Sequence, residues 1–87
     1  MQVRNITVKN PSGLHMRPAG VFANTIMPFR SDVIFSIRNG EYNGKSMISI
    51  LSAAVKCGDE IKLMINGADE QACMDSAITA IEGGLGE

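Results

Sequence analysis

The chain has 87 residues, of which 45% are hydrophobic and 20% are charged, so it is long enough for one hydrophobic core but not for two. Its formal net charge is -1, from eight basic and nine acidic residues, and so weak a field excludes non-specific binding to nucleic acid or to an anionic membrane. We therefore expect one domain over residues 1–87, which acts as a monomer without a nucleic-acid or membrane partner.

The N-terminal segment and the cysteines exclude further classes of protein. Residues 2–5 enter a strand-like pattern without a basic segment and a long apolar run, so neither a signal peptide nor a spanning helix is predicted, and we expect a cytoplasmic protein. Cys57 and Cys73 can form at most one bridge and, with a single histidine, cannot complete a four-ligand zinc site. We expect both to be reduced, small packing residues, and we expect no metal and no cofactor.

The first half of the chain is predicted to form a strand, a helix and then the first strand of a hairpin. Polar and apolar residues alternate over residues 4–9, which is typical of a half-buried strand. Residues 16–27 place apolar side chains at helical spacing, and Pro28 ends that helix. Residues 33–37 alternate again, and Asn39-Gly40 is predicted to supply the two left-handed residues of a tight hairpin.

The second half predicts a short helix, a strand and a final helix. Ser46 is expected to open the short helix, residues 61–65 alternate as a strand, and Asp69 is a candidate cap for a helix that ends at Gly83-Gly84. The order β-α-β-β-α-β-α predicts an α+β protein with its helices on one face of an antiparallel sheet.

The single histidine lies between a glycine-containing loop and the first helix. Pro18 fits the first turn of a helix, which puts His15 at or next to the cap, beside the unpaired backbone N–H groups of Met16 and Arg17. Such a helix start attracts anions, and the Arg17 guanidinium and the Ser12 hydroxyl add partners suited to phosphate oxygens.

A neutral imidazole in this position is a good nucleophile, and a phosphoryl group on its nitrogen stays transferable. The sequence offers no second histidine and no carboxylate beside the loop to activate water, so this pattern favours a carrier over a hydrolase. We expect a phosphoryl carrier and not an enzyme. Gly44-Lys45-Ser46 resembles the end of a nucleotide-binding P-loop, but Asn39 stands where that motif needs glycine.

The segment Gly13-Leu14-His15-Met16-Arg17-Pro18-Ala19 resembles the active-site signature of the HPr family, the histidine-containing phosphocarriers of the bacterial sugar phosphotransferase system. Residues 43–51 resemble the family's second signature, which includes Ser46. The resemblance implies a two-layer open-faced sandwich with sheet order 1-4-2-3, a phosphoryl group on Nδ1 of His15, and Arg17 as its stabilising partner. Apart from the resemblance, the position of the loop and the helix start leads us to expect phosphate-binding support from Ser12, Met16 and Pro18.

The same resemblance implies partners. Enzyme I would load His15 and a sugar-specific enzyme IIA would unload it. Ser46 would be a regulatory phosphosite, modified by HPr kinase/phosphorylase and read by a catabolite-control transcription factor. A docking surface around His15 is expected, with these members: Met16, Gly20, Met47, Ile48 and Leu51.

Three departures from the family pattern bear on these expectations. Met16 replaces the usual alanine, Gly20 replaces a better helix former at a cost of about 1 kcal/mol, and Ser49 stands where glycine is common. The apolar residues near His15 fit a core or a docking patch equally well. Two other functions stay open: a regulatory binding module that acts through phosphorylated Ser46, and a small-molecule-binding α+β domain.

Overall fold

The computed structural model describes residues 1–87 and contains one four-stranded antiparallel sheet. Its strands are β1 (Gln2–Thr7), β4 (Glu60–Asn66), β2 (Asp32–Ile37) and β3 (Gly40–Asn43), in that spatial order. The order β1-β4-β2-β3 confirms the expected topology. The two strands that are adjacent along the chain, β2 and β3, form the hairpin, whereas β4 lies between β1 and β2.

The sheet has one buried face and one open face because its side chains alternate. Val33 pairs with Ile65 and Phe35 pairs with Leu63 across β2 and β4, and all four side chains are buried. The residues between them, such as Lys62, point to the other face and are exposed or half-buried. A strand with this period of two can bury only alternate residues, so the helices must cover the first face.

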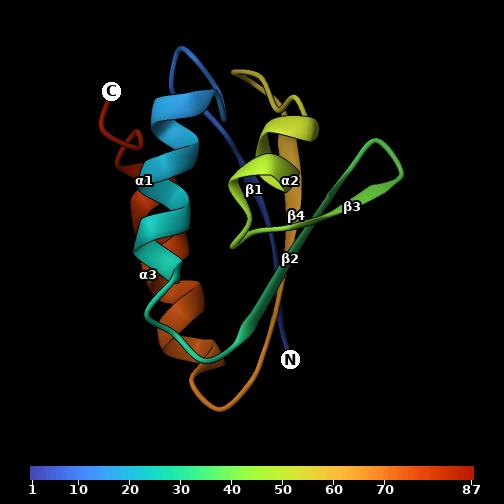
Figure 1. The fold of residues 1–87 in the computed structure, drawn as a ribbon, viewed down its shortest axis with the longest axis vertical. Helices are drawn as coiled ribbons and strands as arrows, with labels where there is room; N and C mark the ends of the chain where they lie inside the picture. The colour runs from blue at the N-terminus through green and yellow to red at the C-terminus, as the bar shows by residue number, and fades with distance from the viewer.

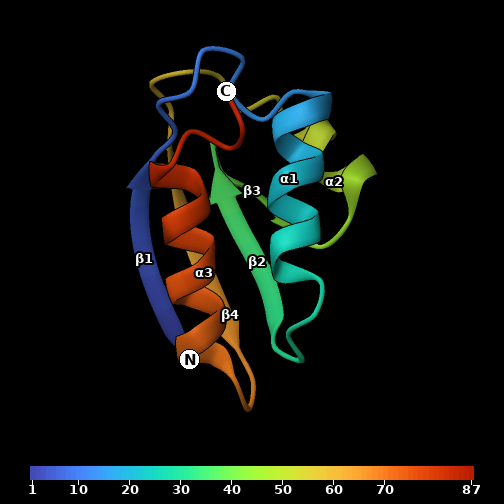
Figure 2. The same cartoon turned by 90° about the vertical axis from the view of Figure 1, so that its left-hand side faces the viewer.

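Three helices cover the buried face: α1 (Met16–Ile26), α2 (Met47–Ser52) and α3 (Glu70–Glu82). Figure 2 shows α1 and α3 side by side in front of the sheet, and Figure 1 shows the same two layers from the edge. Phe22 and Ile26 of α1 and Met74 of α3 are fully buried, and each such side chain stabilises the fold by about 1.5–3 kcal/mol. The expected two-layer open-faced sandwich is confirmed. The longest helix, α3, has 13 residues, so none of the three could span a bilayer.

The hairpin between β2 and β3 turns one residue earlier than predicted. Arg38 and Asn39 take the left-handed conformation, with φ of 49° and 66°, and Ile37 pairs with Gly40. The prediction failed because Ile37 must stay in phase with the buried residues of β2, which fixes the two turn residues after it. The Tyr42 side chain lies close over Gly40, where a Cβ would be 2.7 Å from the Tyr42 hydroxyl oxygen.

The two cysteines lie in different surroundings. Cys73 on α3 is buried in the core, and burial raises the pKa of its thiol. Cys57 is exposed in the connection between α2 and β4, so the prediction that it packs in the core was wrong. Its thiol donates to the Lys9 carbonyl oxygen at 3.4 Å instead.

Asp69 precedes α3, but its carboxylate does not cap that helix. It accepts hydrogen bonds from the backbone N–H groups of Arg30 and Ser31, at 2.9 and 3.0 Å, and from the Ser31 hydroxyl at 2.6 Å. These bonds tie the start of α3 to the loop between α1 and β2. The hydroxyl and amide donors, the Ser31 hydroxyl first, lower the pKa of Asp69 below its ordinary value of 3.8.

Replacing Asp69 with asparagine should lower the melting temperature by several degrees at neutral pH, because three donors lose a charged acceptor. The folded-state pKa lies below 3.8, so the carboxylate's contribution is complete above about pH 5 and is lost as the pH falls below 3.8. Thermal melts of both proteins across this range should therefore converge in acid. Glu82→Gln on the exposed end of α3 is the matched control; equal melts of Asp69→Asn and wild type at pH 7 would contradict the assignment.

Candidate functional site

His15 occupies the N-cap position of α1. Its backbone is extended, with φ of −78° and ψ of −176°, and its carbonyl oxygen accepts the first helical bond from the Ala19 N–H at 2.8 Å. The imidazole makes no capping bond and is exposed. Both ring nitrogens are therefore available to an incoming group.

The first turn of α1 provides donors beside His15. The N–H groups of Met16 and Arg17 have no partner within the helix, as is general for a first turn. The turn contains no acidic residue, and the exposed Arg17 adds a guanidinium. Pro18 has no N–H and is buried against the core, where it fixes the direction of the turn. The result is a positive helix start directly at the imidazole, which suits an anion.

The loop before His15 lies directly on the connection between α2 and β4. Gly13 has a φ of 61°, and a Cβ on it would be 2.3 Å from the Val55 carbonyl oxygen. The next residue, Leu14, is buried, and its N–H donates to the same Val55 oxygen at 2.9 Å. A glycine is therefore required by both conformation and space.

Two residues that the sequence analysis did not select hold this loop from the other side. Asn10 is buried, and its amide donates to the Gly13 carbonyl at 2.7 Å and to a Glu87 carboxylate oxygen at 2.9 Å. The same Glu87 oxygen accepts from the Ser12 N–H at 3.0 Å. These donors, Asn10 first, lower the pKa of the Glu87 carboxyl, and the positive charge of Arg17 adds to the effect.

Figure 2 shows how the C-terminal segment reaches the β1–α1 loop. A turn-forming Asn-Pro-Ser-Gly segment is the signal that could have drawn attention to Asn10. Glu87 carries no comparable local signal because its partners lie more than 70 residues away in the sequence.

A hollow of about 400 Å³ lies beside the imidazole, between the start of α1 and the end of α2. Its lining is mostly apolar: Ser12, Leu14, His15, Met16, Leu51, Ala54, Val55 and Lys56. Thus Met16 and Leu51, two of the predicted docking residues, meet at one hollow. Its apolar wall next to a positive helix start could accept a protein surface that carries a phosphoryl group.

The other predicted docking residues lie around this hollow with different exposure. Ile48 is 80% exposed and Met16 is 66% exposed, whereas Met47 is half-buried and packs against the core. Gly20 lies one helical turn after Met16, and nothing lies within 4 Å of the place its Cβ would take. Exposed side chains of this size on neighbouring helices form an apolar patch rather than a core.

Ser46 is the N-cap of α2, as predicted, and its hydroxyl oxygen accepts from the Ser49 N–H at 3.3 Å. The Ser49 hydroxyl oxygen in turn accepts from the Asn43 N–H at 2.8 Å, so this serine holds the end of β3 against α2. The Lys45 ammonium donates to the Phe29 carbonyl. Ser46 is half-buried at the edge of the apolar patch, next to Met47.

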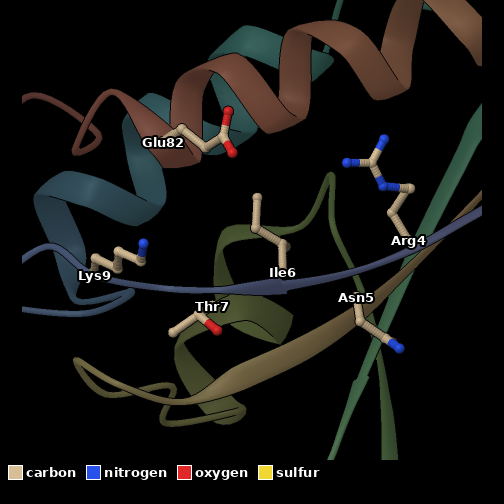
Figure 3. Close-up of a pocket in the computed structure, with 6 residues that line it drawn as sticks. All are labelled: Arg4, Asn5, Ile6, Thr7, Lys9 and Glu82. Carbon is tan, nitrogen blue, oxygen red and sulfur yellow. The ribbon is translucent and has the colours of Figure 1, made fainter.

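A second hollow, of about 330 Å³, follows β1 at the edge of the sheet. Figure 3 shows Arg4 and Ile6 on the α3 side of the strand and Asn5 and Thr7 on the opposite side. Arg4 and Lys9 stand at opposite ends of the hollow and do not converge on one point. This hollow therefore offers no single point at which its charged side chains could act together on one ligand.

Comparisons with known proteins agree with this geometry. The family described as the PTS HPr component phosphorylation site matches residues 2–83. A crystal structure of HPr-C-His from Thermoanaerobacter tengcongensis superposes with a TM-score of 0.96 at 36% identity, and covers 100% of this chain and 98% of that one.

Two curated relatives differ in length. The HPr-like protein Crh of Halalkalibacterium halodurans is 33% identical over 82 residues, which are 94% of this chain and 98% of Crh. The multiphosphoryl transfer protein of Escherichia coli O157:H7 is 35% identical over 83 residues. The match spans 92% of this chain but only 22% of that relative.

The wall of the hollow contains a strained residue that yields a stability prediction. Ala54 is exposed and has a φ of 52°, which costs an alanine about 1–2 kcal/mol relative to the right-handed conformation. Ala54→Gly should raise the free energy of unfolding by about 1 kcal/mol, read from urea denaturation. In the control, Ala72→Gly on the exposed face of α3 should lower it by about 1 kcal/mol. A lower stability for Ala54→Gly would contradict this interpretation.

Proposed function

The chain belongs to the HPr family of phosphotransferase-system components, and on that premise we propose that it accepts a phosphoryl group on Nδ1 of His15 from enzyme I and passes it to an enzyme IIA. The observation that carries the proposal is the position of the imidazole. It is exposed at the N-cap of α1, makes no bond to its own helix, and adjoins the free N–H groups of the first turn.

In the proposed transfer, Nδ1 attacks the phosphorus of a phosphorylated side chain on enzyme I, and the bond between phosphorus and that side chain breaks. The negative charge on the three phosphoryl oxygens would be stabilised by the Met16 and Arg17 N–H groups at the start of α1 and by the Arg17 guanidinium. The N–H groups belong to a helix that is formed before the reaction, so little backbone reorganisation is needed.

The surroundings favour transfer over hydrolysis. The Glu87 carboxylate at this loop accepts hydrogen bonds from Asn10 and Ser12 through one oxygen, and its lowered pKa makes it a weak base for water. An apolar hollow and the exposed side chains of Met16 and Ile48 suit a protein surface that covers the imidazole during transfer. This is the role of a carrier rather than of an enzyme with its own substrate pocket.

His15→Ala should abolish phosphoryl acceptance and leave the melting temperature within about 1 °C of wild type, because surface substitutions usually change stability by less than about 0.5 kcal/mol. The test incubates each protein with enzyme I and phosphoenolpyruvate and measures intact mass under non-acidic conditions. Wild type should gain one phosphoryl group and the variant none. Phosphorylation of the variant at a comparable rate would refute the assignment of His15.

A second function, regulation through phosphorylated Ser46, is supported by two observations. Ser46 caps α2 at the border of the apolar patch, and the similar protein Crh is described as HPr-like rather than as a phosphocarrier. A phosphate there would add close to two negative charges at a helix start, which the helix tolerates. The same charge would stand where enzyme I is proposed to dock.

Ser46→Asp should leave the melting temperature nearly unchanged but slow loading of His15 by at least about 10-fold, since burying a charge without a partner costs more than about 1.4 kcal/mol. Asn5→Asp is the control, because it adds the same charge on the open face of β1. Loading rates with enzyme I and thermal melts should be measured on all three proteins. A Ser46→Asp protein that loads as fast as Asn5→Asp would show that this serine does not border the docking surface.

A further inference from the structure

Arg38 stands at the tip of the β2–β3 hairpin, yet its side chain reaches across to another part of the molecule. One guanidinium nitrogen, Nη1, donates to the Asp59 carboxylate at 3.0 Å. The other, Nη2, donates to the carbonyl oxygens of Ala53 and Ala54 at 2.8 and 3.0 Å. One exposed side chain thus joins the hairpin to both ends of the connection between α2 and β4.

These contacts fix the start of a segment whose end is also held by backbone hydrogen bonds from Gly58 to Val8 and from Val8 to Asp59. Ala53 and Ala54 follow the last turn of the six-residue helix α2, where carbonyl groups lack helical partners and a cation is favourable. Ala54 is in the left-handed conformation. At the other end, Asp59 accepts from the Lys56 N–H at 2.9 Å, and this bond and the Arg38 guanidinium lower the pKa of the Asp59 carboxyl.

The segment that Arg38 holds is the one on which the His15 loop lies. Val55 follows Ala54 directly and accepts from the Leu14 N–H, one residue before His15. The backbone of Gly13 lies against Val55 and Lys56. A shift of the Ala53–Ala54 carbonyls would therefore move the support of the loop and, through it, the imidazole and the wall of the hollow.

We propose that Arg38 is a positioning residue for His15: its guanidinium clamps the Ala53 and Ala54 carbonyls and Asp59, which fixes the α2–β4 connection under the loop that presents the imidazole. This inference rests on the proposed function of His15 as phosphoryl acceptor. Arg38 itself does not touch the reacting atoms.

The backbone at Arg38 supports a role for this particular side chain. A φ of 49° is unfavourable for arginine, and asparagine or glycine suits such a turn position far better. The turn alone gives no reason for an arginine there. Three hydrogen bonds from one planar guanidinium do give a reason, and no shorter or single-donor side chain could make all three.

The test is Arg38→Asn, which removes the guanidinium but suits the left-handed backbone, so the variant should fold. Arg30→Asn is the matched control, because the Arg30 side chain is exposed and makes no hydrogen bond or ion pair. Asp59→Asn is a second variant that keeps Arg38 and weakens one contact of the clamp.

The first measurement is hydrogen exchange of individual backbone amides in the unphosphorylated protein. Arg38→Asn should make the Leu14 N–H exchange at least about 10-fold faster while the amides of β4 keep their wild-type rates. Asp59→Asn should show a smaller effect of the same kind, and Arg30→Asn none. An unchanged Leu14 exchange rate would overturn the proposal. A uniform acceleration over all amides would also overturn it, because Arg38 would then stabilise the whole fold and not this loop in particular.

The second measurement is the steady-state loading of His15 by enzyme I. Arg38→Asn should lower kcat by about 10- to 100-fold with little change in KM, because the apolar patch is intact but the imidazole is displaced. An unchanged kcat, or an effect confined to KM, would overturn the proposal. If wild type itself is not loaded, the proposed function fails, and the Leu14 exchange rate still decides whether Arg38 positions the loop.

Discussion

The close contact between the β1–α1 loop and the α2–β4 connection is the constraint on which the candidate site depends. Gly13 and Leu14 lie against the backbone at Val55 with no room for a side chain between them. Leu14 is thereby buried, and the chain must turn outward at the next residue to begin α1. His15 is exposed at the helix start as a direct consequence, and the free donors of the first turn lie beside it.

Around this contact, polar groups that are distant in sequence hold the loop in one arrangement. Asn10 and Glu87 fix it from the side of the C-terminal segment, and Arg38 fixes its support from the side of the hairpin. None of these three residues has to contact a phosphoryl group in order to hold the loop. Their hydrogen bonds limit the motion of a surface loop, and the transfer proposed for His15 would gain from a loop held in one geometry.

The same arrangement explains how a small protein without an enclosed active site could support group transfer. The hollow beside His15 is shallow and largely apolar, and Ile48 and Met16 extend it as an exposed patch. A partner that covers this patch would exclude water and complete the site. The proposed partner would then meet the exposed Met16 side chain and the open space beside Gly20.

The sequence by itself determined the element order, the buried faces of β2, β4 and the helices, and the choice of His15 and Arg17 as candidates, because these follow from periodicity and from residues adjacent in the chain. It misplaced the hairpin turn by one residue, because the phase of β2 decides that turn. It placed Asp69 correctly at the N-cap of α3 but missed that the carboxylate binds the loop at Arg30 and Ser31. Glu87 and Arg38 were beyond its reach. Their hydrogen bonds join segments 15 to 77 residues apart, and only the packing of helices on the sheet brings such segments together.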